Sequence, residues 1–515
     1  MGCAAAGTRT RRAIRLWPET AAVWAGQDGP AIAVAAGAGA LVITAGGALF
    51  VRSRRRAAMR TTRGKRVKRQ RNRGRATLAA LAAMCAVAAL PGQAYADGPP
   101  AYGFDPGAKN VQGAVRNAEA SVLQPGAVYR SSIEPGEQLY YRVKLDSLTD
   151  AYVSAVAVPK SGGSVAYGDG ITVSIRDLND SRCSSNQTTF GSGETPRPIA
   201  AYAHRTVGKG SSTTCKEAGT YDVLVERESK PTSSPEAWNL ELRFVEEPAL
   251  KSGGPTETTA PKDWPSATPA PLDVEAQKRT GGSSYYDATS LTTGEWIDEI
   301  APGQTRFYRV PVDWGQQIYA SAVLSNTTAD STEFIGNALT LSLDNPAQGH
   351  ITDTSLSYSG KSATTALKPL PPVAYRNRYD YSSQVSTLRF AGWYYLSVTL
   401  SPKVAESYGK DPIALTMSVQ VKNEAGASPY DGDPGIFAVT EKDKELAQSG
   451  DSAPKAAKSA TMQVVAAGAL GTGAVLVLGL GAWTLLARRR AAAAGGPGQV
   501  HEQQPPFGGP PQQGW

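Results

Sequence analysis

Histidine and cysteine are scarce in this chain, whose 515 residues include three histidines and four cysteines. General acid–base catalysis most often uses histidine, and zinc sites use histidine and cysteine at short spacings. His204, His350 and His501 lie far apart, and none has a cysteine or histidine companion at ligand spacing. The sequence therefore predicts a protein that is not an enzyme, with no catalytic residues, no metal ligands and no cofactor of its own.

Two acidic turns make calcium binding an alternative to this prediction. Asp431-Gly432-Asp433 and Gly168-Asp169-Gly170 could present carboxylate and carbonyl oxygens to Ca²⁺ in an extracellular medium. Their spacing matches no EF-hand, and Asp-Gly is also a common turn pair. Calcium remains an alternative with no assigned ligands.

A sustained amphipathic helical period is missing from the middle of the chain, which instead repeats itself. Ile133–Val156 and Ile300–Val323 share eleven identities in twenty-four positions at an offset of 167. Pro198–Ser229 pairs with Pro371–Pro402 at an offset of 173. A unit of about 170 residues is far longer than the ~20–50 of a solenoid repeat, so the sequence predicts a duplicated domain.

Both copies have the strand pattern. YYRVKL and FYRVPV alternate bulky side chains, and so do YVSAVAV, LTLSL, YDVLV and LELRF. Pro135-Gly136 and Pro302-Gly303 supply turns between strands. The predicted fold class is all-β, with two tandem antiparallel β-sandwich (jelly-roll-like) domains and a C-terminal single transmembrane helix.

The repeat also bears on an aromatic and basic cluster, residues 375–379. Its Tyr375 and Arg378 align with Tyr202 and Arg205 of the first copy. Residues shared by both copies are most simply needed by the fold, so we expect a structural role here rather than a binding patch.

The order of these motifs resembles the pre-peptidase C-terminal domain, a small extracellular β-sandwich found beside secreted proteases. In the first copy the order is I-x-PG, YYRV, ITVSIRD, AGTYDVLV and LELRF. The resemblance implies the sandwich fold and an extracellular accessory or binding role, and it implies no chemistry. Each copy is longer than a typical member, and no protease domain is present. The second copy has the same order at Ile300, Pro302, Gly303, Tyr308, Asp344, Gly392, Tyr394 and Val398.

Two segments predict the compartment. Val464–Ala487 has 24 residues without a charge, enough for a spanning helix, and Arg488-Arg489-Arg490 would keep the C-terminus in the cytoplasm. Residues 59–96 have a basic region, an apolar region and a cleavage site before Asp97, typical of a secretory signal peptide cut after Ala96.

Residues 1–58 have two explanations. Met59 is favoured as the true start, because signal peptides stand at N-termini. Alternatively, Ala31–Val51 spans the membrane, residues 52–75 are cytoplasmic and residues 76–90 return outward.

Charge and cysteine usage agree with export. Residues 1–96 have a net charge of +15, whereas residues 97–487 have −9, so the overall +8 does not predict nucleic-acid binding. Cys3 and Cys85 precede the predicted cleavage site, which leaves Cys183 and Cys215 as a predicted disulfide. In the second copy Leu388 aligns with Cys215, and Ile351 lies at or near the position of Cys183.

The predicted function is a non-catalytic protein of the bacterial cell membrane, single-pass, with extracellular domains that recognise or scaffold an envelope protein or glycan. An accessory module for a separately encoded exported hydrolase is one alternative, and a secretion or transport component is another. The predicted segments are a doubtful leader (1–58), a signal peptide (59–96), sandwich domains (97–250 and 284–423) joined by a Pro-rich linker (251–283), a polar stalk (424–462), a transmembrane helix (463–487) and a disordered cytoplasmic tail (488–515).

Overall fold

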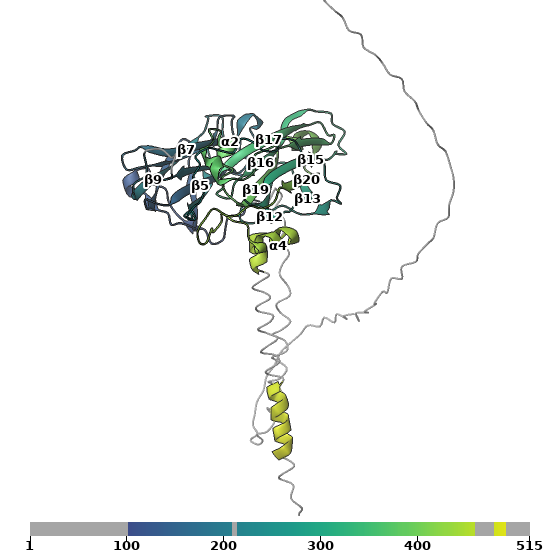
Figure 1. Ribbon diagram of the computed structural model, residues 1–515. Coiled ribbons are helices and arrows are strands. Elements are labelled where there is room, and N and C mark those ends of the chain that lie inside the picture. The colour runs from purple at the N-terminus through teal and green to yellow at the C-terminus, as the bar shows by residue number, and fades with distance from the viewer. Residues whose placement is uncertain (1–100, 209–213, 459–477, 491–515) are drawn as a thin grey trace, which may run out of the picture. The chain divides into compact units, whose positions relative to one another are not determined.

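The computed structural model describes residues 101–208, 214–458 and 478–490, and these contain two β-sandwiches (Figure 1). Each sandwich has two five-stranded sheets, and the strands are antiparallel except for a short parallel strand at one edge of each sheet. The all-β class and the two sandwich-like domains are therefore confirmed.

Sandwich 1 encloses a core of alternate side chains from both sheets, such as Tyr141, Val143, Val223 and Leu242. Its contact sheet, named for the role described below, has the order β1 (Lys109–Asn110), β3 (Val128–Ile133), β10 (Trp238–Glu247), β5 (Asp150–Val158) and β8 (Ile199–Arg205). Its distal sheet has the order β2 (Ser121–Val122), β4 (Gln138–Leu145), β9 (Gly219–Glu228), β6 (Gly170–Arg176) and β7 (Arg182–Thr189).

Sandwich 2 repeats this topology, but its contact sheet is the counterpart of the distal sheet of sandwich 1. Its contact sheet has the order β12 (Thr289–Ser290), β14 (Thr305–Val312), β19 (Gly392–Leu400), β16 (Ile335–Asp344) and β17 (His350–Tyr358). Its distal sheet has the order β11 (Gln277–Lys278), β13 (Gly294–Ile300), β20 (Ile413–Lys422), β15 (Gln317–Leu324) and β18 (Ala363–Ala366). The short helices are η1 (Asn117–Glu119), η2 (Gly191–Gly193), η3 (Tyr375–Tyr379), α2 (Ser383–Ser386), α3 (Val404–Tyr408) and α4 (Glu441–Ser449).

The repeated residues have repeated structural roles in several places. Gly136 and Gly303 of the two Pro-Gly turns have φ of +73° and +79°, a conformation that favours glycine. Tyr221 donates a hydrogen bond to the carbonyl four residues before it, and its counterpart Tyr394 does the same. Both copies share these residues because the turn needs a glycine at this φ and the tyrosine hydroxyl holds the segment that precedes its strand.

The alignment of residues 198–205 with 371–378 is wrong. Tyr202 and Arg205 lie on β8, whereas the second copy forms the 3₁₀ helix η3 there, and its edge strand β18 comes earlier. Arg205 donates to carbonyls within sandwich 1, among them that of Cys215 at 2.8 Å. Arg378 instead pairs with carboxylates of sandwich 1, so the shared residue types serve different purposes.

The predicted linker and stalk are not free of the sandwiches. Gln317 and Gln420 donate to the carbonyls of Pro265 and Ala270, so the Pro-rich segment lies along sandwich 2. In the predicted stalk, Tyr430 and Phe437 are each 1% exposed and α4 packs against β12 and β14. An exposed polar stalk beginning at residue 424 is therefore wrong, because these aromatic rings complete the core between the sandwiches.

Candidate functional site: a cleft between the two sandwiches

The two contact sheets pack their outer faces together. On β10, Leu240 and Leu242 point into the core of sandwich 1, and the alternate residues Glu241 and Arg243 point outward. β5 is buried on both faces from Ala151 onward because sandwich 2 covers its outer side. The apolar part of this contact joins Val156, Val158 and Ala200 of sandwich 1 to Tyr285, Phe307 and Tyr395 of sandwich 2.

A charged cluster holds one end of this interface. Arg378 of sandwich 2 pairs with Glu247 at 2.5 Å and with Asp150 at 2.9 Å. Glu247 also accepts hydrogen bonds from the hydroxyls of Tyr152 and Tyr430, both at 2.6 Å. Burial and the charge of Glu247 raise the pKa of Asp150 to about 6 despite the nearby guanidinium. A buried carboxylate with this many partners depends on both sandwiches staying together.

An aromatic cluster extends this contact. The ring of Tyr152 stacks with that of Tyr202. It also contacts Phe390 and Phe437 of sandwich 2 edge to face, with centroid distances of 4.8 and 6.1 Å. Tyr202 lies so close to Gly349 that a Cβ there would fall 2.4 Å from the ring. The sandwiches therefore form one packed body.

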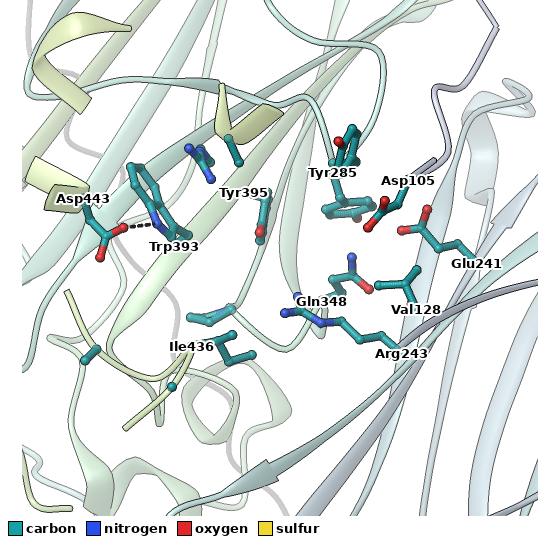
Figure 2. A pocket seen from close by; sticks show the side chains of 16 residues that line it. Asp105, Val128, Glu241, Arg243, Tyr285, Gln348, Trp393, Tyr395, Ile436 and Asp443 are labelled. Carbon is teal, nitrogen blue, oxygen red and sulfur yellow. Dashed lines mark hydrogen bonds between the residues drawn. The ribbon is translucent and has the colours of Figure 1, made fainter. Parts of the chain in front are cut away.

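A cleft of about 350 Å³ opens between the sandwiches beside these contacts. Figure 2 shows Trp393 and Asp443 on one side and Asp105 and Glu241 on the other, with Gln348 reaching in between. The lining residues are Asp105, Val128, Glu241, Arg243, Tyr285, Tyr286, Arg309, Pro346, Gln348, Trp393, Tyr395, Gly435, Ile436, Ala438, Asp443 and Ala453. A cleft at a domain interface with aromatic walls and a few polar groups is a common ligand site.

Three charged side chains of the cleft have buried atoms without a hydrogen-bond partner among the described residues. They are Oε2 of Glu241, Nε of Arg243 and Nη2 of Arg309. Glu241 is 3% exposed, and burial raises its pKa to about 7 although Tyr102 donates a hydrogen bond to its other oxygen. Buried polar atoms are normally satisfied, so these three need an explanation.

The aromatic wall is held in place by polar contacts. The indole of Trp393 donates to Asp443 at 2.9 Å, and the guanidinium of Arg309 lies 4.1 Å from a ring centroid of Trp393. Asp443 also completes the capping box of α4 with Thr440. The segment predicted as a stalk therefore forms one wall of the cleft.

A second cavity of about 270 Å³ lies between the same domains and is rich in proline and glycine. Tyr102, Lys160 and Arg197 are among its lining residues. No residue that lines this second cavity has a buried, unpartnered side-chain atom among the described residues. The cleft is the better candidate for a ligand.

The residues predicted from the sequence have these positions. Cys183 and Cys215 form the predicted disulfide, which is confirmed. Cys183 is the extra residue of a β-bulge between β6 and β7, and Ile351 occupies the equivalent bulge in sandwich 2. Ala96 and Asp97 lie outside the described residues, as do Cys3, Cys85 and His501.

The acidic turns make ordinary turn contacts. Asp169 accepts hydrogen bonds from the backbone of Ala166 and Lys230, and Asp433 accepts one from Gly435. Among the described residues, no group of three histidine, cysteine, aspartate or glutamate side chains could hold a metal ion. Calcium at these turns stays an untested alternative.

His350 has two polar partners that no sequence pattern predicted. Its Nδ1 lies 3.0 Å from Asp344 and its Nε2 lies 3.4 Å from Asp353. Burial lowers the pKa of His350, but the hydrogen bonds and charges of the two carboxylates outweigh it and raise the pKa to about 9. Tyr285 donates to the other oxygen of Asp344 at 2.7 Å, so a charged imidazolium fits this chain of contacts.

The cleft was not predicted either, although the sequence of β5 contains one signal of a covering layer. The run AYVSAVAV on β5 is apolar on both faces, which is typical of a strand in a sheet covered on both sides. That signal indicates a covering layer but not its identity.

Comparisons with known proteins add no function. No protein family matches the sequence, and no curated protein is similar to it. The tandem CBM22 domain of Xyn10C from Paenibacillus barcinonensis is 14% identical over 58% of this chain and 92% of its own, with a TM-score of 0.16. A chain of Broad Bean Stain Virus is 7% identical over 68% of this chain and 98% of its own, with a TM-score of 0.17.

Tripeptidyl Peptidase 2 is similar over 59% of this chain but only 24% of its own, at 8% identity and a TM-score of 0.17. Scores this low carry no argument about this chain. The sandwich assignment rests on the strand order of the chain itself, and the resemblance to the pre-peptidase C-terminal domain stays a prediction.

The predicted transmembrane helix lies mostly outside the described residues. Residues 478–490 are helical, whereas 459–477 are not described. Within the described part of the chain, no helix is both long and apolar enough to cross a membrane.

Proposed function

We propose that this protein is a non-catalytic recognition protein of the cell envelope, in which two extracellular β-sandwiches of pre-peptidase C-terminal type act as one binding unit. The observation that carries the proposal is the cleft between the contact sheets. Both sandwiches and α4 contribute to its walls, and it holds three buried polar atoms without partners among the described residues. Neither sandwich alone encloses this site.

The sequence supports a membrane anchor on the C-terminal side of the cleft. Ala453 lines the cleft and stands eleven residues before Val464, where the predicted span begins. Eleven residues reach at most about 40 Å when fully extended, so the anchor would hold the cleft close to the membrane. The Cys183–Cys215 disulfide suits an exported domain.

Site-specific crosslinking in intact cells tests this function. A photoreactive phenylalanine analogue replaces Tyr286, which is half-buried in the lining of the cleft, or Tyr167, which is 66% exposed and lines no part of it. We expect a discrete crosslinked envelope component from position 286 and none from position 167. Equal products from both positions, or none from either, would contradict recognition at the cleft. An exported hydrolase captured at position 286 would favour the accessory-module alternative.

Protease added to spheroplasts tests the topology independently. We expect loss of epitopes between Asp97 and residue 460 and protection of the tail after Arg490. A protected sandwich region would place both domains on the cytoplasmic side and contradict the proposed topology.

A further inference from the structure

We propose that the cleft binds a saccharide unit of an envelope glycan, an inference that names the ligand class and rests on the recognition function proposed above. The hydrogen-bonding capacity of the cleft, its aromatic wall and its volume support this ligand class.

The unpartnered atoms require a ligand that both donates and accepts hydrogen bonds. Oε2 of Glu241 is an acceptor when ionised, whereas Nε of Arg243 and Nη2 of Arg309 are donors. A phosphate offers mainly acceptors and would repel Glu241, and a simple ammonium offers only donors and would repel the arginines. Hydroxyl groups do both, so a polyhydroxylated ligand suits this set.

The other two carboxylates of the cleft are already in use. Asp443 accepts from Trp393 and from Thr440, and Asp105 accepts from the backbone of Gly107 at 2.7 Å. Among the described residues neither arginine forms an ion pair within 4 Å, although the charge of Arg243 and a hydrogen bond with Gln348 lower the pKa of Glu241 somewhat. Oε2 of Glu241 is the buried carboxylate oxygen of the cleft that accepts no close hydrogen bond from the described residues. Neutral sugars fit this balance, and sugars with a carboxylate fit the side near the arginines.

The aromatic side chains provide the apolar part of the site. Trp393, Tyr285 and Tyr395 line the cleft, and the two tyrosine rings lie 5.1 Å apart. The C–H faces of a pyranose ring pack well on such surfaces, because aromatic faces carry partial negative charge. A volume of about 350 Å³ is near the lower end of the ~300–1,000 Å³ of ligand pockets, which suits a short saccharide rather than a folded partner.

Saturation-transfer NMR with the full-length protein in lipid nanodiscs tests the ligand class. The probes are glucose, galactose, mannose, N-acetylglucosamine, glucuronic acid, maltose, cellobiose and chitobiose, with glycine and inorganic phosphate as non-saccharide probes. We expect at least one saccharide to bind, and we expect Arg309→Lys and Glu241→Gln each to weaken that binding tenfold or more. The matched controls Arg142→Lys and Glu226→Gln lie on the distal sheet of sandwich 1 and should leave the affinity within twofold.

Each outcome decides the matter. Failure of every saccharide, binding of glycine or phosphate alone, or equal saccharide binding by the cleft variants and their controls would overturn the proposal. A negative saccharide result together with a crosslink from position 286 would reject the ligand class and leave the recognition function standing. Melting curves recorded for each variant exclude unfolding as the cause of lost binding.

Discussion

At the scale of single residues, the interface depends on charges that have no solvent around them. Glu247 is 3% exposed and accepts from one arginine and two tyrosines contributed by different parts of the chain. Such a group is stabilised only while its partners remain in place. Removing one partner therefore lowers the stability of the protein by more than the intact pair contributes to it.

Arg378→Met should destabilise the protein by about 3–5 kcal/mol, because Glu247 and Asp150 would remain buried without the cation that pairs directly with both. Urea unfolding at neutral pH measures the change. Arg176→Met is the control, since its pairing with the exposed Asp180 is worth about 0–1 kcal/mol. Equal losses in the two variants would contradict a charge cluster that holds the interface.

Glu241 should make the stability of the protein fall as pH rises. Burial raises its pKa from 4.5 to about 7, so its contribution is fully present below pH 4.5 and is lost as the pH rises through 7. Between pH 5 and pH 8 the wild-type protein should lose about 2–3 kcal/mol more than Glu241→Gln. Urea unfolding at both pH values measures this difference, and parallel losses in the two proteins would show that Glu241 titrates normally.

At the scale of elements, equivalent positions in the two copies are stabilised differently, by a disulfide in sandwich 1 and by apolar side chains in sandwich 2. Cys183 in the bulge of β7 is bonded to Cys215, whereas Ile351 and Leu388 in sandwich 2 are buried in an apolar core. The same strand order is therefore compatible with either a disulfide or apolar side chains at these two positions.

Reduction of the disulfide should loosen sandwich 1 alone. The bond joins residues 32 apart, which corresponds to about 3–4 kcal/mol in the chain-entropy model. Hydrogen exchange after reduction should accelerate in β6 and β7 and stay nearly unchanged in β16 and β17, which serve as the internal control. Uniform acceleration in both pairs, or none in either, would contradict a local role for the bond.

At the scale of the whole molecule, the two sandwiches share a buried interface rather than standing apart on a linker. Tyr152, which belongs to sandwich 1, lies in the core cluster of sandwich 2. Each half therefore carries a large apolar and charged face that water would contact if the halves separated.

Halves of the chain should associate when they are mixed. Residues 97–250 and 284–424, expressed separately, should each have β-type circular dichroism, and a second version of the latter half, residues 251–458, includes Tyr430 and Phe437. Because both rings are buried at the interface, residues 251–458 should bind residues 97–250 at least tenfold more tightly than residues 284–424 do. Analytical ultracentrifugation measures both affinities; halves that stay monomeric at high concentration would refute the packed interface.

The sequence alone determined the sandwich class, the duplication and the disulfide. Alternation of two residues reports one buried face of a strand, and turn glycines such as Gly136 and Gly303 report local backbone geometry. The disulfide was also within reach, because only two cysteines follow the predicted cleavage site. These features depend on residues that are close in the sequence or that have a counterpart at a constant offset.

Only the tertiary structure decided which outer faces meet, and with them the cleft. Glu241 and Arg243 have the pattern of solvent-facing residues on an ordinary strand. Glu241 is buried and Arg243 half-buried because Tyr285 and Gln348, which come far beyond the end of β10 in the chain, lie on the other side of the cleft. Likewise, residues 375–378 form η3 although the residues aligned with them in sandwich 1 lie on β8. The polar composition after residue 424 gave no sign that Tyr430 and Phe437 are buried. Packing between preformed sheets joins side chains far apart in the chain, and no local period carries that information.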